Sequence, residues 1–327
     1  MLRVIVFFLL GALSATPVWA APGDAAVLQA HQAFAARKLA SLEQAARAVP
    51  ADHVLAPYVE YWRLMLTSRT EDARIADFLA RYPGSRMAEA LRADWLKSLG
   101  VREAWPAYLA EYPRLVKPDA AHQCYTYRSE WAQGNRSHQR EAVALWFTGR
   151  DMPSACSPLF AQLMEAGLIR EEDVWRRLRL ALDAGNPSVA RVVANALPED
   201  QRPAAALFDQ AARDPARLLN AAATLDFTRR GDREIALYAL DQLARRSSDP
   251  TEQALRKRAP QFSPEELGTA WARLATWAAR RHETNALAWF QRAVGAATSD
   301  FQREWWARAA LRAGDWQAVQ RAIDGMS

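Results

Sequence analysis

The sequence predicts an all-α protein, an irregular right-handed α-solenoid of stacked helix pairs. Apolar residues recur at helical spacing along the chain, and capping residues and prolines stand before these segments. No stretch shows the sustained alternation of apolar and polar residues that a strand requires. Because one helix pair cannot bury its own apolar face, successive pairs have to pack against one another.

Four segments carry an apolar stripe at helical spacing, which predicts a face that packs into the core. The stripes are formed by Ile75, Phe78, Leu79 and Tyr82; by Tyr58, Trp62 and Met65; by Trp175, Leu178 and Leu182; and by Trp316, Val319 and Ile323.

Capping residues mark the expected helix boundaries. Asn186-Pro187 and Asp214-Pro215 each place an N-cap before a proline at the first helical position. Ser263 and Glu266 have the spacing of a capping box. Three glycines stand where helices are expected to end: Gly185, Gly231 and Gly314.

The same glycines mark a weak repeat of helix, turn and helix. The second helices are expected from Val189, Ile235 and Ala318, and a related turn without glycine lies at Arg281-His282. The glycines are 46 and then 83 residues apart, so the predicted repeat is irregular. The strict tetratricopeptide pattern is absent.

The first twenty residues have the order of a secretory signal. Arg3 gives a positive start, an apolar run extends from Val4 to Leu13, and Ala20 is a small residue at the expected cut. A membrane-spanning helix needs about 20 apolar residues, which weighs against an N-terminal anchor. We therefore expect residues 1–20 to be a signal peptide and residues 21–327 to form one helical domain in the periplasm, without a membrane span.

Cys124 and Cys156 are the only cysteines. In an exported chain this even number predicts one structural disulfide. The bond would close a loop of 33 residues and, in the chain-entropy model, stabilise the fold by about 3–4 kcal/mol. Two buried free thiols are the alternative. A metal site is less favoured, because neither cysteine has a second ligand at zinc spacing.

The sequence predicts no catalytic residue, no cofactor and no metal site. A formal net charge of +5 suits a polyanionic surface but does not demand nucleic acid. No glycine-rich phosphate loop, G-x-S-x-G elbow or HExxH pair occurs. We interpret the five histidines as surface or hydrogen-bonded polar positions: His31, His53, His122, His138 and His282.

Two acidic clusters, Glu171 to Asp173 and Glu265 with Glu266, fall in expected first helical turns. The helix dipole favours carboxylates there. A catalytic carboxylate pair, as glycosidases use, is the alternative. Such a pair would have to share one cleft, and the sequence gives no sign that these clusters meet.

Arginine pairs recur along the chain. Several fall near expected helix C-termini, where the dipole favours cations, and we interpret them in that way. The alternative is a basic inner surface that faces anionic cell-wall strands. The pairs are Arg176-Arg177, Arg229-Arg230, Arg245-Arg246 and Arg280-Arg281.

Tryptophan is frequent, with 13 in the chain. Indole rings can stack on sugars or fill the seams between helices. Most of them lie on apolar stripes, such as Trp62, Trp175 and Trp316, so we expect seam packing. Trp305 and Trp306 are adjacent and cannot both face inward on one helix. One of these two is therefore the candidate for an exposed aromatic.

Four stretches, taken in order, carry a resemblance to a known family. They are Phe78 to Pro83 with Leu91 to Leu96; Leu145 to Arg150 with Ala155 to Phe160 and Gly167-Leu168; Trp175 to Asn186; and Trp306 to Trp316. With both cysteines among them and a signal in front, they resemble the N-terminal superhelical part of the periplasmic soluble lytic murein transglycosylases. The resemblance extends over nearly the whole mature chain.

The resemblance implies a U-shaped superhelix. In this family a separate C-terminal lysozyme-like domain cleaves the MurNAc–GlcNAc bond, with one glutamate as acid and base. That glutamate precedes a serine, and Gly-Leu-Met-Gln-like and Ala-Tyr-Asn-like segments follow. None of the three occurs in this sequence. We therefore expect the catalytic domain to be absent and carry no catalytic residue over.

These observations lead to the hypothesis of a non-catalytic superhelical domain that holds peptidoglycan strands or docks cell-wall enzymes. The rival hypothesis is a periplasmic helical-repeat scaffold for proteins, with no glycan role. A third, an unrecognised all-α enzyme, would need convergent polar groups that the sequence does not reveal.

Overall fold

The computed structural model describes residues 22–221, 224–293 and 298–326. Within these ranges the regular elements are α-helices and short 3-10 helices, without a β-strand, which confirms the all-α prediction. The predicted signal peptide, residues 1–20, lies outside the described residues. Each helix in the described ranges is too short or too polar to cross a bilayer.

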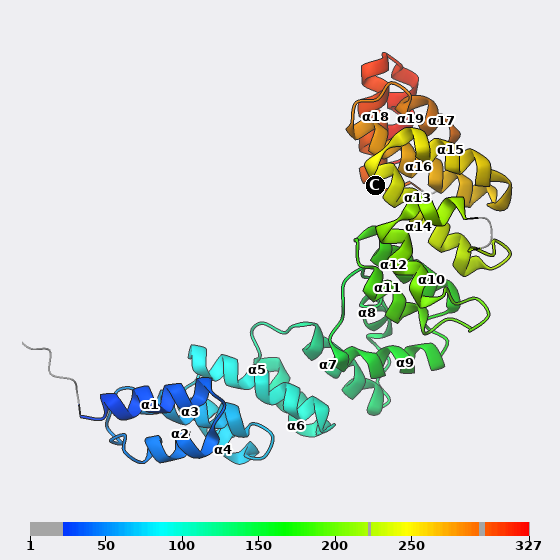
Figure 1. Cartoon of the computed structure of the whole chain (residues 1–327). Coiled ribbons are helices and arrows are strands. Elements are labelled where there is room, and N and C mark those ends of the chain that lie inside the picture. Colours follow the sequence, from blue (N-terminus) through cyan, green and yellow to red (C-terminus); the bar gives the residue numbers. More distant parts are fainter. Residues whose placement is uncertain (1–21, 222–223, 294–297, 327) are drawn as a thin grey trace, which may run out of the picture. The chain divides into compact units, whose positions relative to one another are not determined.

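The chain divides into two compact units, the first ending at Arg136 and the second starting at Ser137 (Figure 1). The helices of the first unit are α1 (Asp24–Ala35), α2 (Leu39–Ala46), α3 (Ala56–Thr67), α4 (Asp72–Arg81), α5 (Arg86–Val101), α6 (Trp105–Glu111), η1 (Tyr112–Arg114) and α7 (Ala120–Ala132).

Neighbouring helices of the first unit pack in pairs, and α5 contacts α3, α4, α6 and α7. The stripe predicted on α4 is confirmed, because Ile75 and Phe78 are fully buried. The stripe predicted on α3 is confirmed only for Trp62, which is half-buried and packs against the core of α1, α2 and α3. Tyr58 is 43% exposed, and the fully packed face of α3 is formed by Val59 and Leu64.

A hydrogen-bond network closes the start of α7. The Asp119 carboxylate accepts from the His122 backbone N–H at 3.1 Å and from the Lys97 ammonium at 2.6 Å. Nε2 of the buried His122 ring donates to the Ala93 carbonyl at 2.9 Å. Burial alone would raise the pKa of Asp119, but Lys97 and the His122 N–H outweigh it and hold the pKa at about 2.

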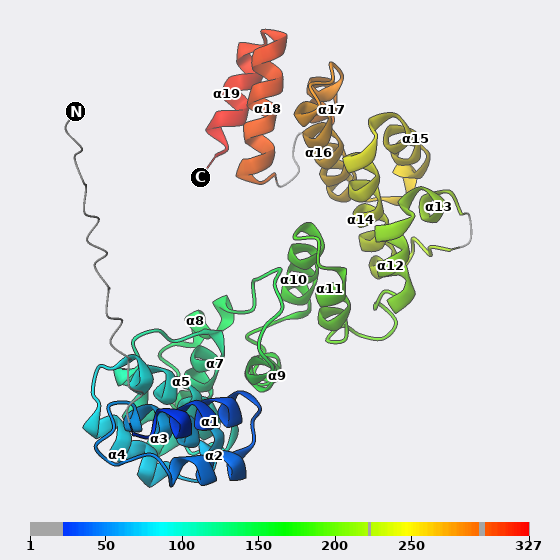
Figure 2. The same cartoon turned by 60° about the vertical axis from the view of Figure 1, so that its left-hand side comes forward.

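The second unit is a longer series of helices, which Figure 2 shows following one another. They are α8 (Gln139–Ala144), η2 (Ser154–Cys156), α9 (Ser157–Glu165), α10 (Glu171–Asp183), α11 (Pro187–Ala194), α12 (Ala205–Arg213), α13 (Pro215–Asn220), α14 (Arg230–Arg246), α15 (Ser248–Arg258), η3 (Ala259–Gln261), α16 (Pro264–Arg280), α17 (Ala286–Arg292), α18 (Asp300–Ala313) and α19 (Trp316–Asp324).

The last three helix pairs form a more regular repeat than the glycines suggest. Their first helices begin at residues 230, 264 and 300, which is a spacing of 34 and then 36 residues. Gly185 and Gly314 end their helices with positive φ, as predicted, and His282 takes the same left-handed conformation after α16 with φ 63°. The turn expected without glycine is therefore present.

Gly231 does not end a helix, contrary to prediction. It lies in the first turn of α14, which begins at Arg230 rather than near Ile235. A Cβ atom at this position would stand 2.3 Å from the Gln201 carbonyl oxygen. Glycine is required there by the close approach of another backbone segment, not by a helix end.

The predicted caps differ in outcome. Asp214 accepts from the Arg217 N–H, and Ser263 and Glu266 form the expected capping box. Asn186 precedes α11 as predicted, but its side chain donates to the Gly149 carbonyl at 2.8 Å instead of capping the helix. The stripe on α10 is confirmed by the full burial of Trp175 and Leu178.

Arginines join successive first helices of the second unit at their C-terminal ends. Arg246 donates to carbonyls at the end of α12, Arg281 to the Ala244 and Arg245 carbonyls of α14, and Arg312 to the Ala279 carbonyl of α16. The last carbonyls of a helix have no partner within it. Each of these helices is therefore capped by an arginine from the helix pair that follows.

Arg258 caps α13 in the same way from α15. The side chain is 7% exposed, and Nε and Nη2 donate to the Leu219 carbonyl at 3.1 and 2.8 Å. Nη2 also reaches the Ala221 carbonyl at 3.2 Å. This is the most buried of the arginine caps.

Cys124 and Cys156 are both fully buried, and neither is a free thiol, because both are disulfide-bonded. The expected structural disulfide is therefore present in the structure, and the alternative of two free thiols is not what the structure shows.

Replacing Arg258 by methionine, which keeps the stem and removes the guanidinium, should destabilise the second unit by about 1–3 kcal/mol, because buried carbonyls lose their donors. Arg256→Met is the matched control. Arg256 lies on the same helix but is exposed. Its ion pair is an i,i+4 pair with Glu252, worth less than about 0.5 kcal/mol, and its guanidinium lies 5.8 Å from the Trp271 ring centre. Urea unfolding followed by circular dichroism measures both, and equal losses would contradict the capping role.

Asp119→Asn should reduce the acid sensitivity of the fold. The pKa of Asp119 in the folded chain, about 2, lies below its ordinary value of 3.8. Its stabilising effect is therefore complete above pH 4 and is lost as the pH falls through 2. The thermal unfolding midpoint of the variant should be lower at pH 7 and fall less steeply between pH 4 and 2. Parallel curves for the two proteins would exclude this contribution.

Candidate functional site

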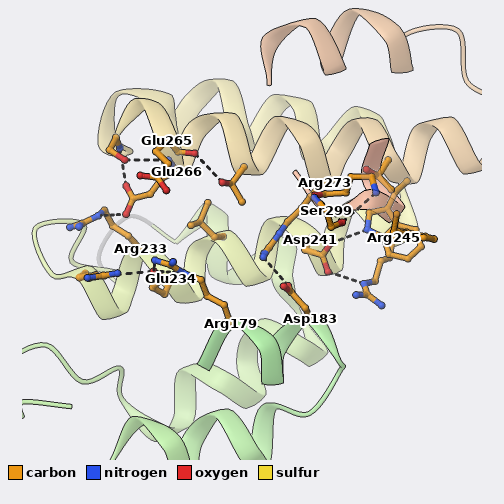
Figure 3. Close-up of a pocket in the computed structure, with 18 of the residues that line it drawn as sticks. Arg179, Asp183, Arg233, Glu234, Asp241, Arg245, Glu265, Glu266, Arg273 and Ser299 are labelled. Atoms are coloured by element: carbon orange, nitrogen blue, oxygen red, sulfur yellow. Dashed lines mark hydrogen bonds and ion pairs between the residues drawn. The ribbon is translucent and has the colours of Figure 1, made fainter. Parts of the chain in front are cut away.

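A groove on the second unit is lined by four helices. Residues of α10, α14, α16 and α18 enclose a cavity of about 770 Å³ (Figure 3). The first helices of the three regular pairs supply most of the lining. The arginine caps fix these helices at their C-terminal ends, so their polar faces meet along one groove.

The lining is highly charged but balanced. It holds five arginines and six acidic side chains, and each arginine pairs with a carboxylate at a closest N–O distance of 2.5–2.9 Å. A basic inner surface, the alternative considered from the arginine pairs, is therefore not what the groove presents. The five pairs are Arg179 with Glu234, Arg230 with Glu172, Arg233 with Glu266, Arg245 with Asp241, and Arg273 with Asp183.

Glu234 is the most deeply placed of these carboxylates, with a side chain that is 2% exposed. Both of its oxygens accept from Nε of Arg179, and Oε1 also accepts from Nη2. This hydrogen bonding raises the pKa of Arg179, against the opposing effect of burial. A buried carboxylate needs such a partner, because an unpaired charge at this depth is costly.

Glu172 lies at the outer edge of the groove. Its carboxylate accepts two hydrogen bonds from Arg230 at 2.7 and 2.8 Å, and these lower its pKa. A glycosidase acid needs a raised pKa. The environment of Glu172 therefore acts in the opposite direction from that of a general acid.

One end of the groove combines arginine and aromatic side chains. The Trp277 indole donates to Asp241 at 2.8 Å, and Nε of Arg245 donates to the other oxygen of that carboxylate at 2.9 Å. The guanidinium groups of Arg245 and Arg280 lie 4.6 and 4.5 Å from the centre of the Trp277 ring. We call Arg245, Trp277 and Arg280 the arginine–tryptophan cluster. Arg245 and Trp277 line the groove, and Arg280 contacts its lining through the rings of Trp277 and Phe301.

Both acidic clusters contribute to this groove, which the sequence did not indicate. Glu171, Glu172 and Asp173 form the first turn of α10, and Glu265 and Glu266 that of α16, as predicted. Glu172, Glu265 and Glu266 nevertheless line the same cavity. Glu172 and Glu266 pair with arginines of α14 that are 58 and 33 residues away in sequence. Local sequence patterns therefore cannot indicate that the two clusters line one groove.

Two of the four arginine pairs lie at helix C-termini, as interpreted from the sequence. Arg245-Arg246 ends α14, and Arg280-Arg281 ends α16. Arg229-Arg230 instead stands at the start of α14. Arg176-Arg177 lies inside α10, with Arg177 buried and its guanidinium 4.2 Å from the Trp146 ring centre.

Of the three tryptophans on the predicted stripes, Trp175 is buried, Trp62 is half-buried and Trp316 is exposed. Trp316 is 73% exposed, and Ile323 on the same face of α19 is 50% exposed, so only Val319 of that predicted stripe packs inward. Trp306 is buried, and Trp305 is half-buried with Arg308 over its ring. The most exposed of these rings is therefore Trp316, not either member of the adjacent pair.

The histidines are placed by hydrogen bonds or lie at the surface. His53 is buried and bonds to Asp24 at 3.0 Å, and His122 belongs to the cap of α7. His31, His138 and His282 are exposed. Among the described residues, no group of three or more His, Cys, Asp or Glu side chains could hold a metal ion.

One signal in the sequence could have found the groove. Along α14, the charged groove residues recur at helical spacing on one face, and most of the other residues of this helix are buried and apolar. A charged stripe on a largely buried helix indicates a polar site. These residues are Arg230, Arg233, Glu234, Asp241 and Arg245.

Comparison with known proteins gives a consistent result, although no family model matches the sequence. Over 227 residues the chain is 30% identical to the soluble lytic murein transglycosylases of Escherichia coli K12 and Salmonella typhimurium LT2. The matched segment is 68% of this chain and 34% of each relative. The chain thus matches about a third of the length of these relatives.

Two solved structures share the fold at 24% identity. The 70-kDa soluble lytic transglycosylase of Escherichia coli aligns with 93% of this chain and 50% of its own, with a TM-score of 0.56. An inactive mutant of the lytic transglycosylase Slt from Pseudomonas aeruginosa aligns with 92% of this chain and 49% of its own, with a TM-score of 0.59. The superhelical fold class is thereby confirmed.

Glu234→Gln should destabilise the second unit by about 1–3 kcal/mol, because the neutral amide cannot replace the carboxylate in its ion pair with Arg179. The loss stays in this range because solvent partly screens the Arg179 side chain. Glu265→Gln is the control, since Glu265 is exposed on the same groove. Chemical unfolding of the two variants should separate them clearly. A loss as large for Glu265→Gln would show that the groove depends on its total charge rather than on this pair.

Proposed function

We propose that this chain, a homologue of the soluble lytic murein transglycosylases over two thirds of its length, is a helical domain that holds peptidoglycan strands. The homology is the observation that carries the proposal. The domain acts as a non-catalytic scaffold, and the mature chain of residues 21–327 works in the periplasm. The signal-like order of residues 1–20 and the disulfide support that location.

The groove on the second unit is the binding surface of this proposal. Peptidoglycan offers amides, carboxylates and amino groups, and the groove offers guanidinium and carboxylate groups already fixed in pairs. Such pre-organised side chains lose little conformational entropy on binding. The alternation of charge also lets one strand make favourable contacts of both signs.

A second candidate function is favoured by a separate observation. Trp316 and Ile323 leave an apolar face of α19 exposed. Exposed aromatic and aliphatic groups of this kind are common at protein interfaces. In this alternative the domain docks cell-wall enzymes and has no role in glycan binding.

Co-sedimentation with purified sacculi tests the main proposal. The mature chain should sediment with sacculi, release no anhydro-muropeptides, and bind less as salt is raised from about 0.05 to 0.5 M, because charged contacts are screened. Trp316→Ser should leave sacculus binding unchanged, since Trp316 lies outside the groove.

The opposite results are equally informative. Release of anhydro-muropeptides by the chain alone would contradict the non-catalytic role. No sedimentation with sacculi, together with retention of periplasmic proteins that Trp316→Ser abolishes, would assign the chain to the protein-docking function instead.

A further inference from the structure

The arginine–tryptophan cluster has unused hydrogen-bond donors on both of its arginines. Arg245 reaches Asp241 through Nε alone. Among the residues that the structure describes, Arg280 forms no ion pair, and its guanidinium contacts only the rings of Trp277 and Phe301, at 4.5 and 5.9 Å. Both arginines are exposed. The terminal nitrogens of both guanidinium groups, each placed against the Trp277 ring, are thus open to a ligand.

The local charge at this end of the groove is positive. Asp241 faces the cluster and is 5% exposed, and both of its oxygens are already engaged by Trp277 and Arg245. Two guanidinium groups therefore stand against this one carboxylate. This imbalance of one charge suits a single anionic group.

The geometry favours a carboxylate over a neutral sugar. A sugar that stacks on tryptophan needs an open ring face. The guanidinium carbons of Arg245 and Arg280 lie within 4.6 Å of the Trp277 ring centre, where a stacked sugar would have to sit. The planar fork of a guanidinium matches the two oxygens of a carboxylate.

We propose that Arg245 and Arg280, held over Trp277, bind a carboxylate of the peptide stem of peptidoglycan. This inference rests on the proposed function, because that function brings peptidoglycan to the groove. Asp241 is a positioning residue: it orients Trp277 and Arg245 and does not touch the ligand. The cluster binds the peptide stem, while the ion-paired side chains along the rest of the groove contact the glycan strand.

Isothermal titration calorimetry of the full mature chain tests the assignment with three probes. They are a soluble disaccharide–tetrapeptide, the bare disaccharide left after removal of the peptide, whose lactyl group is a free carboxylate, and neutral chitotetraose. The disaccharide–tetrapeptide should bind most tightly and chitotetraose not at all. Arg280→Gln should weaken binding of the disaccharide–tetrapeptide about tenfold, the loss expected for a charge-assisted hydrogen bond.

The chain offers a matched control in Arg292. This side chain is also exposed in a last helical turn and lies 5.0 Å from the ring centre of a tryptophan, Trp271. Trp271 does not line the groove, whereas the rings that Arg280 contacts do. Arg292→Gln should leave binding unchanged. Arg245→Gln, with folding checked by circular dichroism, should weaken binding as Arg280→Gln does.

Each other outcome overturns a defined part of the proposal. Equal binding of the bare disaccharide would assign the carboxylate to the lactyl group rather than the peptide. Binding of chitotetraose, or an unchanged affinity in both arginine variants while sacculi still sediment, would remove the carboxylate site and leave the proposed function standing. Arg280-dependent binding of the disaccharide–tetrapeptide without sedimentation of sacculi would keep the site and exclude the proposed function.

Discussion

The capping of helix C-termini by arginine is the interaction on which the second unit depends. The last carbonyls of each helix lack partners, and the helix dipole makes that end negative. Arg246, Arg281 and Arg312 supply donors to the ends of α12, α14 and α16, each from the helix pair that follows. The planar guanidinium can reach two carbonyls at once, as Arg281 does. The chain uses arginine almost everywhere in preference to lysine, and its only lysines are Lys38, Lys97, Lys117 and Lys257.

The caps have a consequence for the groove. Because successive first helices are joined at the same end, the polar stripes of α14 and α16 come to lie along one surface. Arginine–carboxylate pairs then form between helices, and the pair of Glu234 with Arg179 shows how deeply one can be placed. Buried ion pairs are a weak source of stability. We therefore interpret the pairs as fixing polar groups for a ligand rather than as holding the fold together.

Local sequence patterns predicted the helices well, and long-range contacts explain what they missed. The α10 stripe and the caps at Asp214 and Ser263 depend on residues a few positions apart. The role of Gly231 was predicted wrongly, because glycine is required there by the close approach of the Gln201 backbone. Sequence spacing cannot show such a contact. The apolar residues of α19 recur at helical spacing, as predicted. Such spacing shows only that one face of the helix is apolar, and it does not show whether another element covers Trp316.

The candidate site was harder to predict than the fold for the same reason. Asp183 and Arg273 are 90 residues apart and meet across the groove. The two acidic clusters were each explained by a helix start, which was correct but incomplete, since a first-turn carboxylate can also face a ligand. Only the charged stripe along α14 gave a local sign of the groove.

Hydrogen–deuterium exchange of the mature chain, with and without a soluble peptidoglycan fragment that carries its peptide, tests the central claim most directly. The predicted result is slower exchange in α14, α16 and the start of α18, with the first unit unchanged. Slower exchange confined to the first unit or to α19, with none along the groove, would contradict the assignment of the groove as the peptidoglycan-binding surface.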